Sequence, residues 1–446
     1  MNQLHSPKIE NGKKSYEELQ WFLNRRREAA APVFGNSVSG NENTASLTWH
    51  LNRNLETYLD AKKEEKERLH LALLRRLTDS LKFQAESLKK AEETGLIKDC
   101  DADYLSVTPL SPSLAGTERR RDIKMICILD TLENLPANTK DISAFGNGSV
   151  VCWTENAVMT IAGDGCVRLN SSARFLFAHY SSLQEIRFCE RLRTERTKDF
   201  FGMFYGCRKL SAVDPGNWDV SSAENMGCMF ASCGSLESLD LSLWKVSLVT
   251  DMQAMFRNCR RLSHLQTAGW DVSGVRHMDF LFDSCVRLTN PSVSGWKVSS
   301  VTSMSAMFRK CRQLRSLDLS AWDVSHVTDF SSMFLGCMNL RQLDLHSWNV
   351  SRGIYLNRMF DSCTNLQDLS LKGWNPSGAE DLSFLFHACV NLTELDIAKW
   401  NVRQVKNMSG MFSSCMSLSN LVLTEWLIED HTVIDDIFSG TGNCLK

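Results

Sequence analysis

The chain repeats itself every 26 residues, and this period constrains its fold more than any other feature of the sequence. Cysteine follows the repeated phenylalanine by three residues in nine units, and tryptophan returns nine times in the same register. A fixed period of this length is typical of a solenoid, in which each unit buries its apolar side against its neighbours. The repeated phenylalanines are Phe204, Phe230, Phe256, Phe282, Phe308, Phe334, Phe360, Phe386, Phe412 and Phe438.

Each unit carries two apolar patterns. In residues 304–311, apolar side chains at i, i+3, i+4 and i+7 match one face of a short α-helix. Residues 314–319 then read L-x-x-L-x-L, which predicts a short strand with Asp318 on its outer side. We therefore expect an α/β solenoid with one short strand and one short helix per unit. Because helices pack about 8–10 Å apart and strands about 4.8 Å, such a stack curves with its strands on the concave side.

The fixed residues of the repeat resemble a known family. Residues 307–327 follow the pattern Met-Phe-x-x-Cys-x-x-Leu-x-x-Leu-Asp-Leu-Ser-x-Trp-Asp-Val-Ser-x-Val. This pattern resembles the BspA-like leucine-rich repeats, in the 26-residue form known from mycoplasma-type lipoproteins, and it extends over residues 200–446. The resemblance implies a leucine-rich-repeat solenoid. It also implies a protein that is surface-exposed or secreted and binds other proteins.

A second, shorter match lies upstream of the repeats. Cys152-Trp153 leads to residues 158–165, which are similar to the β segment that often opens BspA-like arrays. Residues 175–188 follow the repeat pattern in a degenerate form. We therefore expect a β-rich cap and a degenerate first repeat over residues 123–199.

The first 122 residues do not show the period. Residues 1–45 are polar and weakly patterned, which favours a flexible N-terminus. Residues 46–98 are rich in Leu, Lys, Glu and Arg and carry a helical apolar stripe, so we expect a helical region there. This region is interpreted as a helical hairpin, a cap, or a surface for oligomerisation through residues 46–95. Residues 99–122 are interpreted as a linker.

Composition and motifs exclude several classes of function. The 50 Lys and Arg residues balance 52 Asp and Glu, so the net charge of −2 argues against capture of nucleic acid. No apolar run approaches the about 20 residues that span a bilayer, and we see no secretory signal. No catalytic, cofactor-binding or metal-ligand motif is present, so the chain is not expected to be an enzyme.

The cysteines and tryptophans are interpreted as parts of the core. The chain has 16 cysteines, and the nine in the repeat are an odd number with no C-x-x-C pair among them. We therefore expect buried thiols rather than disulfides, which favours folding in a reducing compartment. The tryptophans recur beside Leu and Phe, which favours core anchors over a stripe for stacking carbohydrate.

Variable residues on a fixed scaffold are where recognition would be encoded. Strand positions that face outward vary from unit to unit, and one of them is often Asp. Its carboxylates are interpreted either as partners for the local turn or as a row that attracts a cation or a basic partner. The candidate partner-binding residues on the concave face are Asp214, Asp240, His264, Asp318, Gln342, Asp344, His346, Asp368, Lys372, Glu394 and Asp396.

These observations predict a non-enzymatic scaffold for protein–protein interaction. The first hypothesis is a surface-presented or exported binder or effector that recognises a protein partner on the concave face. The alternative is an intracellular scaffold or regulator whose helical region forms oligomers or binds a second partner. An enzyme with its site in residues 1–145 is a third hypothesis, but no nucleophile–base or acid–base constellation supports it.

Overall fold

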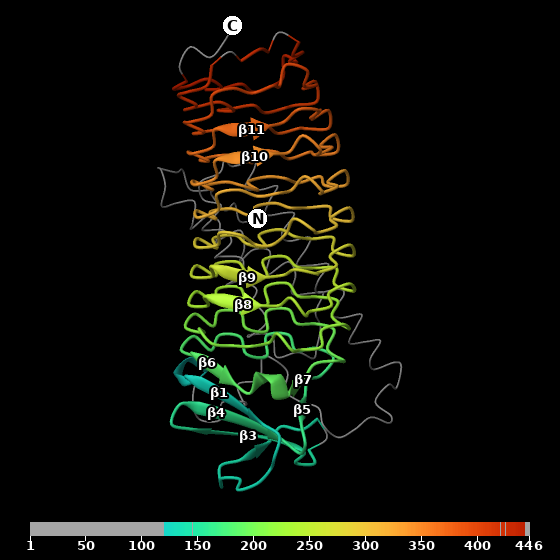
Figure 1. Cartoon of the computed structure of the whole chain (residues 1–446), viewed down its shortest axis with the longest axis vertical. Helices are drawn as coiled ribbons and strands as arrows, with labels where there is room; N and C mark the ends of the chain where they lie inside the picture. The colour runs from blue at the N-terminus through green and yellow to red at the C-terminus, as the bar shows by residue number, and fades with distance from the viewer. Residues whose placement is uncertain (1–119, 145, 420, 424, 442–446) are drawn as a thin grey trace, which may run out of the picture. The chain divides into compact units, whose positions relative to one another are not determined.

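The computed structural model describes residues 120–144, 146–419, 421–423 and 425–441 (Figure 1). The expected flexible N-terminus (1–45), the helical region (46–98) and residues 99–119 of the linker lie outside the described residues. In the part of the chain that is described, no helix has the length and hydropathy needed to cross a bilayer.

A five-stranded sheet precedes the repeats, with the strand order β2–β3–β4–β1–β6. Strands β3 and β4 form an antiparallel hairpin whose two loop residues, Asn156 and Ala157, both have positive φ, as a type I′ turn requires. Strand β1 lies parallel to both β4 and β6, so the sheet leads directly into the first coil. The strands are β1 (Met125–Leu129), β2 (Lys140–Asp141), β3 (Val150–Glu155), β4 (Val158–Gly163) and β6 (Glu185–Arg187).

Short elements complete the region before the regular repeats. Strand β5 (Val167–Arg168) pairs in parallel with β7 (Leu192–Arg193). Two 3₁₀ turns are present: η2 (Arg120–Asp122) precedes β1, and η3 (Cys189–Arg191) lies between β6 and β7. The β segment expected from Cys152 to residue 165 is therefore present as strands β3 and β4.

The strand side of the repeats is less regular than the sequence predicts. Parallel strands form in four units, as β8 (Ser238–Asp240), β9 (His264–Gln266), β10 (Gln342–Asp344) and β11 (Asp368–Ser370). In each strand the middle residue points inward and its neighbours point outward. Residues 290–292 form no strand, because Pro291 takes the inner position and has no N–H to donate. Residues 316–318 and 394–396 also lack a strand, so the prediction of one strand in every unit is wrong.

The predicted helix in each repeat is also wrong, because a run of β-turns stands in its place. In residues 252–259, alternate N–H groups donate to the carbonyl three residues earlier, as Arg257 does to Ala254 at 3.0 Å. The N–H groups between them donate to the next coil, as Phe256 does to Leu281 at 3.0 Å. Ala254 and Asn258 take positive φ, which the third residue of a type II turn requires.

The spacing of the coils explains why a helix does not form. The phenylalanine rings stack from Phe177 to Phe438 with centroids 5.3–5.9 Å apart. The tryptophan rings stack from Trp244 to Trp426 at 5.9–6.5 Å. Helices need about 8–10 Å, so a helix does not fit within one coil. The difference between helix spacing and strand spacing, which predicted a concave strand side, is therefore absent. Figure 1 shows the coils following one another evenly.

The ladder cysteines are buried thiols, as predicted. Each of the nine donates its Sγ–H to a phenylalanine carbonyl of the preceding coil, as Cys311 does to Phe282 at 3.2 Å. Burial raises the pKa of Cys259 and Cys337 to about 12, so these thiols stay protonated at neutral pH. Every cysteine among the described residues is free.

The tryptophan indoles donate hydrogen bonds to the coil before them, with two exceptions that share one feature. Trp322 donates its Nε1–H to the Val293 carbonyl at 3.1 Å, and most ladder tryptophans repeat this contact. Trp296 and Trp400 have no such acceptor. Each follows a coil in which the residue before tryptophan is a glycine with positive φ, Gly269 at 88° or Gly373 at 87°. A positive φ at this position is typical of a type II turn, so both exceptions follow a coil with that turn type.

Replacing Gly373 with alanine is expected to lower the free energy of unfolding by about 1–2 kcal/mol, because a Cβ disfavours a φ of this sign. The matched control is Gly295→Ala, at the same position of another coil. Gly295 does not have positive φ, and an added Cβ there would meet no atom within 4 Å. Chemical denaturation of both variants measures the difference. Equal losses would show that the positive φ is not what requires glycine.

Candidate functional site

We define the strand face by three outward positions of each coil. They are the first and third residues of the strand segment and the residue two positions after it, such as Gln342, Asp344 and His346. All eleven candidate residues lie on this face and are exposed. Because the coils stack in fixed register, each position forms a row along the stack. The candidates are Asp214, Asp240, His264, Asp318, Gln342, Asp344, His346, Asp368, Lys372, Glu394 and Asp396.

The third residue of each strand segment forms the central row of the strand face. Aspartates in this row accept hydrogen bonds from the turn that follows them. The Asp240 carboxylate accepts the N–H of Ser242 at 3.0 Å, and Asp318 accepts that of Ser320 at 3.2 Å. Asp214 repeats the contact with Gly216. Hydrogen bonds from the serine lower the pKa of Asp240 and of Asp318, so both remain charged at neutral pH. These bonds agree with the turn-holding interpretation and leave the second carboxylate oxygen facing solvent.

One acid–base pair stands on the strand face. The Nδ1 of His346 lies 2.8 Å from Oδ1 of Asp344, and both side chains are more than half exposed. The contact with His346 lowers the pKa of Asp344. The Ser370 side chain also hydrogen-bonds to Asp344, and among the residues described no group of three or more potential metal ligands is found. The strand face therefore presents charged and hydrogen-bonding side chains at this point.

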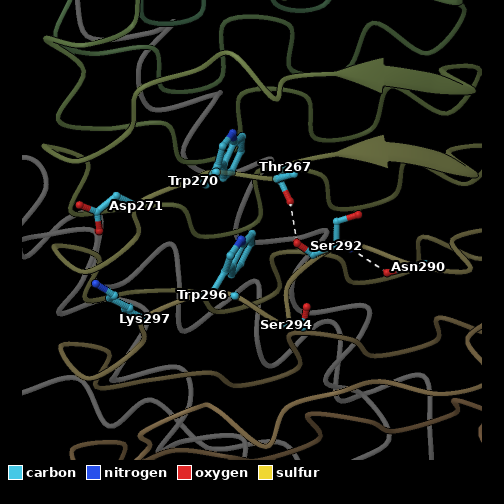
Figure 2. Close-up of a pocket in the computed structure, with 11 residues that line it drawn as sticks. Thr267, Trp270, Asp271, Asn290, Ser292, Ser294, Trp296 and Lys297 are labelled. Carbon is cyan, nitrogen blue, oxygen red and sulfur yellow. Dashed lines mark hydrogen bonds between the residues drawn. The ribbon is translucent and has the colours of Figure 1, made fainter.

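A cleft of about 610 Å³ opens beside the strand face, between the coil of β9 and the next coil. Small residues such as Gly269 and Gly295 line it, and Pro291 lies at its edge in the irregular strand segment. Figure 2 shows Thr267 pointing toward Ser292, and the Thr267 hydroxyl donates to the carbonyls of Pro291 and Ser292 at 3.1 and 3.4 Å. This cleft was not predicted from the sequence, although proline at a leucine position was a usable signal.

The tryptophans in the cleft do not offer a platform for carbohydrate. Trp270 and Trp296 stack on each other at 5.9 Å and are only 4% and 3% exposed (Figure 2). Their ring faces are covered by neighbouring tryptophans, so a sugar ring has no exposed face to contact. The prediction that these residues are core anchors is confirmed.

A buried charge cluster lies on the opposite side of the stack, among the turns. Asp283 is 1% exposed and receives Nε of Arg257 at 3.0 Å. Arg309 donates to both of its oxygens, at 2.9 and 2.8 Å. The two guanidinium groups also lie 5.1 and 5.3 Å from the ring of Phe280. The sequence analysis did not identify this cluster, because the pairing joins three different coils.

Three of the solved structures similar to this fold are leucine-rich-repeat proteins of low sequence identity. The T. pallidum leucine-rich repeat protein is 21% identical over 38% of this chain and 72% of its own, with a TM-score of 0.26. A leucine-rich repeat protein from Eubacterium ventriosum is 13% identical over 62% and 95%, with a TM-score of 0.30. The functional domain of InlJ from Listeria monocytogenes, which includes a cysteine ladder, is 13% identical over 57% and 55%, with a TM-score of 0.21.

No curated protein matches the chain. One family model matches it three times, over residues 171–290, 260–369 and 339–445. These matches overlap and together span the repeats, which make up more than half of the chain. They confirm the resemblance to BspA-like, mycoplasma-type leucine-rich repeats. The chain therefore belongs to the family described as "Mycoplasma protein of unknown function, DUF285".

Proposed function

We propose that the protein is a non-enzymatic scaffold that binds a protein partner on the strand face. The observation that carries this proposal is the contrast between the two sides of each coil. Phe, Cys and Trp recur without change in the buried core, while the exposed rows differ from coil to coil. A rigid stack of this kind holds varied side chains at fixed spacing, which suits recognition of an extended surface.

Charge on the strand face is expected to contribute to partner binding. The test variant replaces Asp240, Asp318 and Asp344 with asparagine. Asparagine retains the oxygen that accepts the turn N–H, so the turns stay closed while three charges are lost. We expect partner affinity to fall about tenfold, from exposed ion pairs worth about 0.2–1 kcal/mol each.

The repeat supplies a matched control for this experiment. Asp219, Asp271 and Asp323 accept serine N–H groups in the same way, at 3.0, 3.1 and 3.1 Å, but they follow the ladder tryptophans and lie outside the strand face. Both triple variants, made in the full chain, are used to capture proteins from the native organism, and captured proteins are quantified. Partners retained by the control and lost by the strand-face variant support the proposal. Identical captured sets would contradict it.

We propose the cellular location of the protein from what is usual in the family. BspA-like repeats are usually surface-exposed or secreted, which supports a surface-presented or exported binder. The alternative is an intracellular scaffold, which the free thiols of all described cysteines favour. Fractionation of the native organism with a C-terminally tagged chain separates them. Protein in the medium, on the surface or in a host cell supports the first, and protein confined to the cytosol supports the second.

A further inference from the structure

Six arginines gather on four consecutive coils, at the corner where the turns end and the strand face begins. Each follows a ladder cysteine by one, two or four residues, so all six project from the same corner. Every one of them is exposed. We call this set the arginine row: Arg260, Arg261, Arg287, Arg312, Arg315 and Arg341.

The arginine row lacks matching carboxylates of its own. Arg261 contacts Glu237, and no other member forms an ion pair with a described residue. The corner positions are those one, two and four residues after each ladder cysteine. In the nine coils from residue 208 to residue 419, Glu237 is the only acidic residue at these positions. The chain as a whole has a net charge of −2, so this positive charge is a local concentration and not a reflection of composition.

Backbone bonds hold neighbouring members of the arginine row side by side. The N–H of Arg341 donates to the carbonyl of Arg315 at 3.2 Å, which places their side chains on adjacent coils. Like charges at the spacing of neighbouring strands, about 4.8 Å, repel each other. An anion that carries its charges at a similar spacing would relieve this repulsion.

The spacing along the arginine row is about 1 Å shorter than the side-chain repeat on one face of an extended polypeptide. The core rings of the coils that carry it, Phe282, Phe308 and Phe334, are 5.5 and 5.7 Å apart. In an extended chain, side chains on one face recur every about 6.6–6.8 Å. Alternate acidic residues can therefore reach successive arginines, whose side chains are long and adjustable.

We propose that the arginine row binds an acidic polypeptide segment that runs along the stack in extended form. Two features favour a polypeptide over a nucleic acid. None of the Phe, Tyr or Trp side chains on these coils is exposed, so bases find none of these rings to stack on. The carboxylates of Asp240, Asp318 and Asp344 flank the row and repel a polyanion that is wider than a single chain. The arginine row adjoins the strand face but shares no residue with it, and this proposal does not depend on the function proposed above.

The test measures binding of a defined peptide to the full chain. A fluorescein-labelled peptide of six Glu-Thr repeats is titrated by fluorescence anisotropy, with six Gln-Thr repeats and a thymidine dodecanucleotide as comparisons. The row variant carries Arg312→Gln, Arg315→Gln and Arg341→Gln. Its matched control carries Arg276→Gln, Arg352→Gln and Arg403→Gln, which are exposed arginines at other positions of the coil.

We expect the Glu-Thr peptide to bind the wild type and the control variant alike, and the row variant about tenfold more weakly. Raising the salt from about 50 to about 300 mM should weaken binding, because the contacts are exposed. Equal affinity of the Gln-Thr peptide, equal loss in both variants, or no binding to the wild type would overturn the proposal. Tighter binding of the oligonucleotide with the same dependence on the arginine row would assign this surface to nucleic acid instead.

Discussion

Replacing Phe308 with alanine is expected to lower the free energy of unfolding by about 3–5 kcal/mol. Phe308 is completely buried in the middle of the phenylalanine ladder, with ring centroids of its neighbours at 5.5 and 5.7 Å. Its removal opens a cavity between coils that bond to each other through their backbones, so the surroundings cannot collapse easily. The substitution weakens the interfaces with both adjacent coils. In a stacked repeat, such interfaces between neighbours contribute much of the stability.

The matched control for this substitution is Phe438→Ala, at the same position of the last coil described. Phe438 is only partly buried and stacks on Phe412 at 5.5 Å. A loss of about half that of Phe308 or less is expected, because fewer contacts disappear. Chemical denaturation followed by circular dichroism measures both losses. Equal losses would show that the ladder does not stabilise the stack through two-sided packing.

Replacing Asp283 with alanine is expected to cost about 3–5 kcal/mol, because it leaves two buried guanidinium groups without their carboxylate. The side chains of Arg257 and Arg309 are only 15% and 11% exposed, so water cannot replace the lost partner fully. The control is Asp318→Ala, which removes an exposed carboxylate and should cost about 1 kcal/mol or less. Thermal or chemical denaturation of the two variants compares them directly.

Replacing all three charged residues of the cluster should lower the free energy of unfolding far less than replacing Asp283 alone. A triple variant, Arg257→Met, Asp283→Leu and Arg309→Met, leaves no buried charge unpaired. It should recover most of the stability that Asp283→Ala loses. If the triple variant were as unstable as the single one, packing of the side chains and not charge pairing would explain the loss.

The Asp283 cluster also predicts how the free energy of unfolding depends on pH. Burial alone would raise the pKa of Asp283, but Arg309, Arg257 and the Ser284 hydroxyl outweigh it and lower the pKa in the folded state. A lowered folded-state pKa contributes stability that is complete above the pKa of the unfolded chain, about 4. This contribution is lost as the pH falls through the folded value. The acid-induced decrease in unfolding free energy should therefore be smaller in the triple variant than in the wild type.

The candidate site was partly predictable from sequence. Outward strand positions follow from alternation around inward leucines such as Leu239 and Leu343, so the exposure of the eleven candidates could be expected. The turn-holding role of Asp240 and Asp318 was one of two interpretations, and only the backbone geometry shows the bonds. The cleft near Pro291 and the pairing of Asp283 depend on which side chains adjacent coils bring together.

The sequence by itself determined the stack, its period and its buried residues. Ten phenylalanines, nine cysteines and nine tryptophans in one register permit a single way of aligning the coils. Only the tertiary structure decided that a run of β-turns, and not a helix, lies between each tryptophan and the next strand segment. The spacing i, i+3, i+4, i+7 points the same side chains inward in a helix and in a run of turns. Backbone bonds to coils 5–6 Å away stabilise the turns, because a helix would satisfy its N–H groups internally and hold its neighbours too far apart.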